Sequence, residues 1–206
     1  MLDKAMAVIA AIESGPASLA ELVERSELSR PTAHRLAVAL EAHGLVRRDG
    51  EGRFGLGLRL IGLGHGAAES IPVSVAARPA LMWLHEQTGE SVQLFVRDGD
   101  ARVCVDSIES PRELRTIVPI GARLPLDAGS AGKVLAGATG AWVQSVAERE
   151  EGVASVSAPV RDGRGRLVAA VSVSGPIQRL SSRPGAKYGE VVAEAARRIE
   201  STAHLG

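Results

Sequence analysis

The feature that most constrains the fold is a succession of three short helical patterns, each with its own start or stop signal. Apolar residues recur at helical spacing over Lys4–Ser14. A second helix is expected from Ser18, because Ser18 and Glu21 have the spacing of a capping box. Ser29 is a suitable N-cap for a third helix, and Gly44 is suited to end it.

A hairpin signal follows the third helix directly. Two short strands are expected in LVRRDGEGRFGLG, on either side of the turn residues Asp49–Gly52. Three helices followed by a hairpin are the elements of a winged helix-turn-helix. We therefore assign residues 1–57 to a winged helix-turn-helix DNA-binding domain and expect a linker helix over residues 58–72.

The remainder of the chain, residues 73–206, has a different pattern. Two alternating runs flank Asp98–Asp100 and another two flank Asp162–Gly163, so two β-hairpins are expected. A long helix precedes the first hairpin, and an amphipathic helix over Lys187–His204 closes the chain. Hairpins flanked by helices indicate an α+β ligand-sensing domain.

Composition excludes several classes of protein. Lys and Arg total 24, as do Asp and Glu, so the formal net charge is zero. This charge argues against a polycationic protein that binds nucleic acids nonspecifically, although a local basic patch is possible. The single cysteine, Cys104, excludes a disulfide framework and a Cys-rich zinc site. No apolar run is long enough to span a membrane, and the start MLDKAMAVIAAIESG is too acidic for a signal peptide. We therefore expect a cytoplasmic protein with no metal site and no membrane contact.

A glycine-rich stretch similar to a phosphate-binding loop occurs at residues 125–137, PLDAGSAGKVLAG. A P-loop has the form Gly-x-x-x-x-Gly-Lys-Ser/Thr. Here Asp127 occupies the first glycine position and would repel phosphate, and Val134 replaces the residue that would ligate magnesium. We therefore expect no nucleotide and no other cofactor. The start of a helix at this point can still bind a small anion such as a carboxylate.

Two sets of motifs resemble the IclR family of bacterial transcription regulators. The likeness to its DNA-binding domain lies in SLAELVERSELSRPTAHRLAVALEAHGLVRRDGEGRFGLG. The likeness to its effector domain lies in GARLPLDAGSAGKVLAG and VSAPVRDGRGRLVAAVSVSGPIQRL. The resemblance implies a GAF-like α/β effector-binding domain, a homodimer or tetramer, and double-stranded operator DNA as the partner.

A finer resemblance concerns the run QSVAEREEGVASVSAPV, which is similar to the actinobacterial subgroup typified by NdgR and LtbR. This likeness implies a repressor or activator of genes for leucine or related amino-acid biosynthesis. It also implies an amino acid or a short organic acid as the effector.

The DNA contacts are expected from the third helix and the hairpin. A recognition helix presents its N-terminal residues to base edges, and a wing contacts phosphates or the minor groove. Six arginines against three acidic residues make the segment from Leu28 to Arg59 basic. A solvated helix surface is the alternative for any single residue. The expected contacts are Ser29, Arg30, Thr32, Ala33, His34 and Arg35 on the helix, and Arg47, Arg48 and Arg53 on the wing.

The resemblance also implies a set of effector contacts in the second half of the chain. Ser130 and Ala131 would offer backbone N–H groups to an effector carboxylate at the start of a helix. Strand alternation independently places Ser172 and Ser174 on one face, with valines of the same strand on the other. Close packing of small residues is the alternative explanation. The full set is Ser130, Ala131, Ser145, Ser155, Ser172 and Ser174.

One connection departs from the family pattern. Members of the family carry a few tens of residues, including a loop over the pocket, between the segments that match GSAGKVLAG and WVQSVAERE. Only ATGA separates these segments here, near residues 138–142. Either the cover of the pocket is truncated or residues are missing from this sequence, and the intact flanks favour the second explanation. A purified protein with a mass near 21.4 kDa would contradict it.

Two other functions are weighed against a regulator. A hydrolase or transferase could use the serine-rich pocket, but the chain has no Gly-x-Ser-x-Gly elbow, and only His85 could serve as a base. A ligand-binding module with a decayed DNA-binding half is opposed by the intact caps, turns and basic residues. The expected function is therefore a DNA-binding regulator that responds to a small metabolite and has no catalytic residues.

Overall fold

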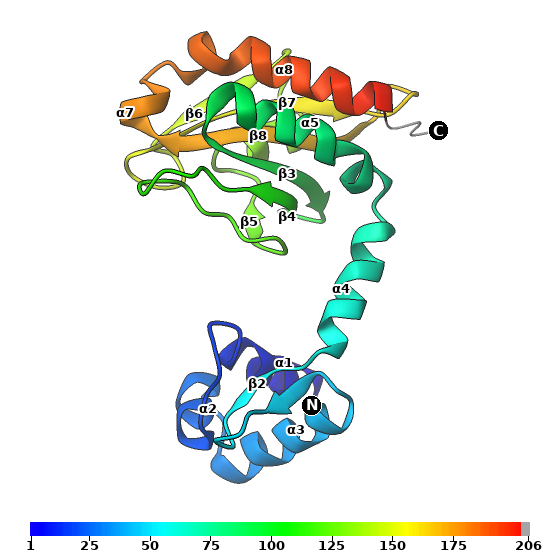
Figure 1. Ribbon diagram of the computed structural model, residues 1–206, viewed down its shortest axis with the longest axis vertical. Helices are drawn as coiled ribbons and strands as arrows, with labels where there is room; N and C mark the ends of the chain where they lie inside the picture. Colours follow the sequence, from blue (N-terminus) through cyan, green and yellow to red (C-terminus); the bar gives the residue numbers. More distant parts are fainter. Residues whose placement is uncertain (203–206) are drawn as a thin grey trace. The chain divides into compact units, whose positions relative to one another are not determined.

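The computed structural model describes residues 1–202, so His204, the end predicted for the last helix, lies outside the described residues. The chain divides into two compact units, Met1–Ala67 and a second unit from Ala68 onward (Figure 1). Helix α4 (Arg59–Glu69) crosses this division and corresponds to the predicted linker helix. Each unit has its own apolar core.

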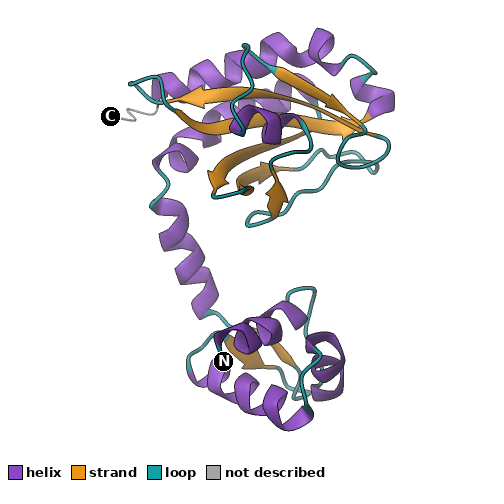
Figure 2. Cartoon of the chain, turned by 180° about the vertical axis from the view of Figure 1, so that it is seen from behind, coloured by secondary structure: helices purple, strands orange, loops and turns teal. Residues whose placement is uncertain are grey.

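The N-terminal unit packs three helices against a two-stranded antiparallel sheet (Figure 2). Its core includes Val8, Ile12, Leu22, Ala37 and Phe54. This arrangement confirms the expected winged helix-turn-helix. The elements are α1 (Leu2–Ala11), α2 (Leu19–Ser26), α3 (Arg30–Ala42), β1 (Val46–Arg48) and β2 (Phe54–Leu56).

The local signals of this unit have the predicted roles, with one exception. The Ser18 hydroxyl accepts from the N–H of Glu21 (3.3 Å), and the Glu21 carboxylate accepts from the N–H of Ser18 (2.7 Å), which confirms the capping box. Gly44 follows α3 with a φ of +70°, as expected of a glycine beyond a helix end. Ser29 precedes α3, but its hydroxyl donates to Thr32 Oγ1 (2.9 Å) and does not cap the backbone.

The bounds of the first helix differ from the prediction. Helix α1 spans Leu2–Ala11, whereas the apolar spacing predicted Lys4–Ser14. The chain after Ala11 tightens into turns, in which the N–H of Gly15 donates to the carbonyl of Ile12 (3.2 Å), three residues earlier. The apolar spacing continues through this tightened turn, which is why periodicity alone extended the helix.

The C-terminal unit is built on a six-stranded antiparallel sheet with the strand order β5-β4-β3-β8-β7-β6. Both predicted hairpins form, one from β3 and β4 and the other from β7 and β8. The strands are β3 (Ser91–Asp98), β4 (Ala101–Ile108), β5 (Arg123–Pro125), β6 (Val143–Val146), β7 (Val153–Arg161) and β8 (Leu167–Pro176). The helices are α5 (Pro72–Thr88), α6 (Ser130–Leu135), α7 (Ile177–Leu180) and α8 (Pro184–Thr202).

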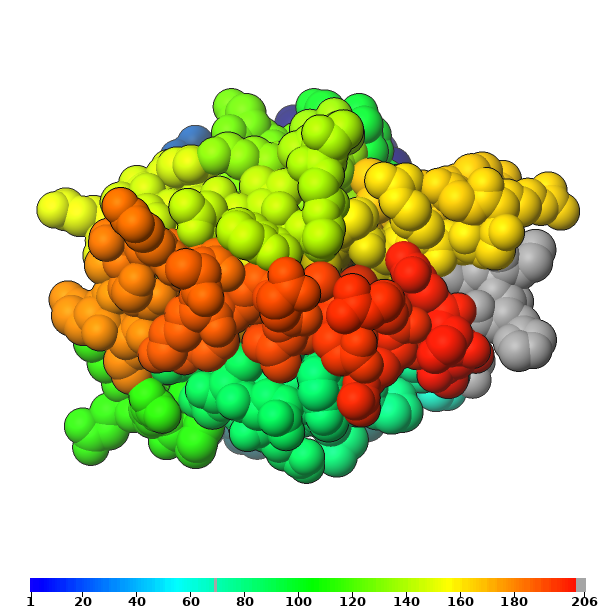
Figure 3. Space-filling view, turned by 90° about the horizontal axis from the view of Figure 1, so that it is seen from above, coloured from blue at the N-terminus to red at the C-terminus, as the bar shows by residue number. Residues whose placement is uncertain are grey.

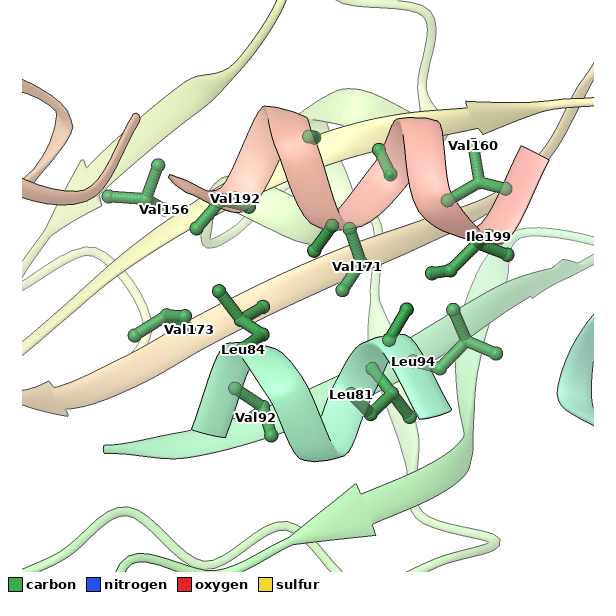
Figure 4. Close-up of a cluster of buried hydrophobic side chains, with 14 of the residues drawn as sticks. Leu81, Leu84, Val92, Leu94, Val156, Val160, Val171, Val173, Val192 and Ile199 are labelled. Carbon is green, nitrogen blue, oxygen red and sulfur yellow. The ribbon is translucent and has the colours of Figure 1, made fainter. Parts of the chain in front are cut away.

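Helices α5 and α8 lie side by side on one face of this sheet (Figures 1 and 3). Leu81 and Leu84 of α5 and Val192 and Ile199 of α8 meet the valines of β8, including Val171 (Figure 4). All five side chains are fully buried. Burial of a side chain of this size contributes about 1.5–3 kcal/mol, so this face holds the main core.

The opposite face of the sheet is covered in part by the short helix α6. Val134 and Leu135 of α6 pack with Phe95, Cys104 and Ala170 in a second, smaller apolar cluster. Burial raises the pKa of the Cys104 thiol to about 12, and this cysteine packs as a small apolar side chain, as predicted. Beside this cluster the strands present polar side chains, which form the site described below.

Candidate functional site

Basic side chains are exposed at the start of α3 and on the hairpin. Arg30, His34 and Arg35 are exposed on α3, and Arg47 and Arg48 are exposed on β1. Arg30 and His34 are four residues apart, which places them on one side of the helix. These side chains are therefore available to an anionic partner.

One predicted DNA contact is wrong. The side chain of Ala33 is fully buried and packs in the core of the N-terminal unit with Val8 and Ala37. Its helical position faces inward, so it cannot contact a base edge. Thr32 is half-buried, and its hydroxyl accepts from Ser29 (2.9 Å), while Ser29 itself is exposed.

The hairpin arginines differ in how far they are engaged within the chain. Arg53 is half-buried and donates to the carbonyl of Pro16 (2.6 Å). Arg48 donates through Nε to the carboxylate of Glu41 (3.1 Å). Arg47 is exposed and forms a longer contact, 3.3 Å from its Nε to the Leu56 carbonyl. Arg47 is thus the arginine of the hairpin that is most available to a partner.

In the C-terminal unit, strand register gathers polar side chains into two adjacent rows across the sheet. The first row comprises Ser145, Ser155 and Ser174, and the second comprises Ser157, Ser172 and Gln93. Alternation along β8 places the valines between these serines in the main core on the other face. The predicted division of β8 into a polar and an apolar face is thereby confirmed.

Ser130, the first residue of α6, joins the two rows. Its hydroxyl donates to Ser155 Oγ (2.7 Å) and lies 2.7 Å from Ser157 Oγ. Ser157 in turn donates to Ser172 Oγ (2.9 Å). The hydroxyl groups therefore hydrogen bond to one another across the space between α6 and the sheet.

A cavity of about 30 Å³ lies beside this hydroxyl cluster, enough for about two water molecules. Its lining brings together all six residues predicted as effector contacts, from three strands and one helix. These residues are Ser130, Ala131, Ser145, Ser155, Ser172 and Ser174. Close packing of small residues also explains the hydroxyl contacts, and apolar side chains of Phe95, Val118 and Leu124 complete the lining of the cavity.

Sequence reasoning missed three polar residues of this region. Ser157 follows Ser155 by two positions on β7, and that spacing could have revealed it. Gln93 interrupts the apolar pattern of β3, and its Oε1 accepts from Ser174 (3.0 Å). Arg102 occupies an inward-facing position of β4, and its sequence neighbours gave no signal that it would be buried.

The start of α6 already has an internal acidic partner. The N–H of Gly129 donates to Glu148 Oε2 (3.4 Å), and Lys133 forms an ion pair with the same carboxylate. Burial raises the pKa of Glu148, but the hydrogen bonds from Lys133 and Gly129 outweigh burial and hold the pKa below its ordinary value. Lys133 is therefore engaged with Glu148 outside the cavity.

Within the described part of the chain no histidine lines the cavity, and His85 Nδ1 lies 2.8 Å from the carbonyl oxygen of Glu90. Within residues 1–202, no group of three His, Cys, Asp or Glu side chains is placed to hold a metal ion. The helices described over the same residues include none long and apolar enough to cross a membrane.

Comparison with known proteins covers both units. The family model for the IclR helix-turn-helix domain matches residues 1–50, and the model for the C-terminal domain of the bacterial transcriptional regulator IclR matches residues 65–145 and 139–201. The HTH-type transcriptional regulator KipR of Bacillus subtilis is 34% identical over 113 residues, which are 55% of this chain and 45% of KipR. The transcriptional repressor IclR of Escherichia coli is 26% identical over 226 positions, which cover 90% of this chain and 82% of that protein.

Solved structures agree with the fold. An IclR homologue from Microbacterium hydrocarbonoxydans, in complex with 4-hydroxybenzoate, superposes with a TM-score of 0.82, at 20% identity and over 100% of this chain and 99% of that one. The family models together span nearly the whole chain, in the order of the two units. The chain therefore belongs to the IclR family of bacterial transcriptional regulators, with a DNA-binding helix-turn-helix domain and a C-terminal ligand-binding domain.

Proposed function

We propose that this chain acts in the cytoplasm as a homodimer or tetramer that reads a pseudo-palindromic operator through α3 and the hairpin. The observation that carries this proposal is the exposure of Arg30, His34 and Arg35 at the start of α3. Arginine can donate two hydrogen bonds to guanine in the major groove. A two-fold operator requires at least two copies of the chain. The proposed contacts are Ser29, Arg30, Thr32, His34, Arg35, Arg47, Arg48 and Arg53.

The cavity beneath α6, at about 30 Å³, is proposed to widen on binding and then to hold the effector, an amino acid or a short organic acid. The convergence of hydroxyl groups from three strands and α6 supports this assignment. The fold neighbour from Microbacterium hydrocarbonoxydans was solved with an organic acid, 4-hydroxybenzoate. An effector that binds two conformations of the protein unequally shifts their populations and thereby changes the affinity for DNA.

The regulon is proposed to include genes of leucine or related amino-acid biosynthesis, with the chain acting as their repressor or activator. The support is the likeness of residues 144–160 to the subgroup typified by NdgR and LtbR. A thermal-shift screen of amino acids and short organic acids, followed by operator binding with each hit, tests the effector class. Transcription of the leucine genes that does not change when the regulator is deleted would contradict this regulon.

A segment is proposed to be missing between α6 and β6, near residues 138–142. The alignment with the Escherichia coli repressor runs over 226 positions, more than the 206 residues of this chain, so the relative carries residues that this chain lacks. The match to the C-terminal family model is split into two pieces that overlap at residues 139–145. In the family, a loop over the pocket belongs at this place.

Replacement of Ser172 and Ser174 by valine is expected to remove the effector response. The double variant loses two hydroxyls of the cavity and places methyl groups where a polar ligand would bind, which should weaken effector binding at least about tenfold. Operator affinity should stay within about twofold, because the changes lie in the other unit. Calorimetry with a hit from the screen measures the first quantity and fluorescence anisotropy the second.

The control for this pair is Ser201→Val, at an exposed position of α8. It should leave effector binding unchanged. Unchanged calorimetric affinity in the Ser172→Val/Ser174→Val protein would show that the effector binds elsewhere.

A further inference from the structure

A buried arginine lies at the cavity without a full set of partners. Arg102 of β4 is 3% exposed and lines the cavity together with the serines. One terminal nitrogen, Nη1, donates to the carbonyls of Ala128 (2.7 Å) and Pro125. Its Nε is buried and has no hydrogen-bond partner among the described residues. A guanidinium N–H that is buried without a partner is costly, so a ligand that accepts from it would be stabilised.

The charge of Arg102 is also poorly compensated. Burial and, to a smaller extent, the positive charge of Arg149 lower the pKa of the guanidinium to about 10, and Asp127 opposes this shift. Carbonyl oxygens satisfy hydrogen bonds but do not neutralise a charge. A buried cation whose partners are mainly carbonyls therefore favours the arrival of an anion.

A second donor lines the same cavity without a partner. Gln93 is 1% exposed and its Oε1 accepts from Ser174, but its Nε2 has no partner within residues 1–202. The two buried polar groups that lack partners here are thus both N–H donors. The ligand that complements them offers acceptor atoms, and the adjoining charge of Arg102 selects acceptors that are negatively charged.

We propose that Arg102 determines the specificity of the effector cavity by binding the carboxylate of a small acid. One carboxylate oxygen accepts from Arg102 Nε and the other from Gln93 Nε2, while the serine hydroxyls bind the remaining polar groups of the acid. This inference rests on the proposed function, in which the cavity holds an effector. In this inference the effector carboxylate binds Arg102 of β4 and Gln93 of β3 and not the start of α6.

The start of α6 is a less favourable site for a carboxylate than Arg102, because Glu148 already lies there. The N–H of Gly129 already donates to Glu148, whose carboxylate lies at that helix end. A second carboxylate there would face the negative charge of Glu148. Arg102 has the opposite charge, and it lies against Gly129 and Gly132, where a side chain at either position would meet its guanidinium. The glycines thus leave room for Arg102 beneath the helix.

The experiment measures the stabilisation of the protein by acids and by their neutral amides. Thermal shift and calorimetry are carried out with acetate and L-lactate, and with acetamide and L-lactamide as their uncharged counterparts. At least one acid should raise the Tm of the wild-type protein in a saturable manner, and its amide should not. Arg102→Gln should weaken binding of that acid at least about tenfold, because a charge-assisted hydrogen bond is lost. The control Arg123→Gln, which alters a half-exposed arginine of β5, should stay within about twofold.

Arg102→Gln could instead act by loosening the loop that Arg102 holds. A second variant, Gln93→Glu, keeps that loop contact and adds a negative charge to the cavity, so it should also abolish the shift caused by the acid. The inference is overturned if no acid binds the wild type, if an amide binds as tightly as its acid, or if both variants bind the acid normally. Operator binding without ligand separates this test from the proposed function. If the wild-type protein does not bind its operator, the proposed regulatory function is wrong. The binding of acids by the Arg102 and Gln93 variants tests only the proposed carboxylate contact.

Discussion

Arg35→Ala is expected to lower the affinity for the specific operator by about 5- to 150-fold, a change of about 1–3 kcal/mol in binding free energy. Arg35 is exposed in the second turn of α3, the region of a recognition helix that reaches base edges. Its loss removes a guanidinium that can pair with a guanine, and no neighbouring charge replaces that bidentate geometry. The affinity for a scrambled sequence should fall far less, because contacts with phosphate groups supply most of the nonspecific affinity.

Arg59→Ala is the matched control for this substitution. Arg59 is also exposed, but it lies at the start of α4, and its Nη1 donates to the carbonyl of His43 (3.0 Å). Fluorescence anisotropy at one fixed salt concentration compares the two variants, since affinities measured at different salt concentrations cannot be compared. Equal losses of affinity would mean that α3 is not the reading helix.

Arg179→Met is expected to lower the free energy of unfolding of the C-terminal unit by about 3–5 kcal/mol. Glu90, between α5 and β3, is 1% exposed and accepts from Arg179 of α7 through both carboxylate oxygens (2.7 and 2.8 Å). Arg112 makes a longer contact with the same group (3.3 Å). Without Arg179 the buried carboxylate of Glu90 keeps only the weaker contact with Arg112. A buried charge without full compensation lowers the free energy of unfolding.

The control for the buried pair is Arg112→Met. Its side chain is half-exposed, so its loss should cost less than about 1 kcal/mol. A double variant, Glu90→Gln with Arg179→Met, should recover most of the loss because no buried charge remains. Chemical denaturation measures all three proteins. Equal destabilisation by Arg179→Met and Arg112→Met would show that the ion pair of Arg179 with Glu90 does not stabilise the C-terminal unit more than the contact of Arg112 does.

The elements with strong local signals could be predicted from the sequence. The capping box at Ser18 and the glycine after α3 fixed the helices of the N-terminal unit, and Asp-Gly turns fixed both hairpins of the C-terminal unit. The strands β5 and β6 and the helix α7 have three or four residues each, too short for any periodicity to appear. They form because neighbouring strands and helices position them, and a local pattern does not contain that information.

The same distinction applies to the site. Alternation along β8 revealed Ser172 and Ser174, because a strand's period is visible in its own sequence. The inward position of Ala33 was missed because a small residue fits either a helix surface or a core. Arg102 was missed for a different reason. Its burial depends on the loop around Pro125 and on the start of α6, which reach β4 only through the tertiary fold.

This chain is expected to bind specific operator DNA and to release or retain it according to an acid bound in the cavity. The most direct measurement is a gel shift of the full chain with the DNA upstream of its own gene, with and without the acid identified by thermal shift. A discrete complex at low salt, resistant to scrambled competitor and changed in affinity by the acid, is the predicted result. Failure of a correctly folded oligomer to bind that DNA at low salt would contradict this expectation.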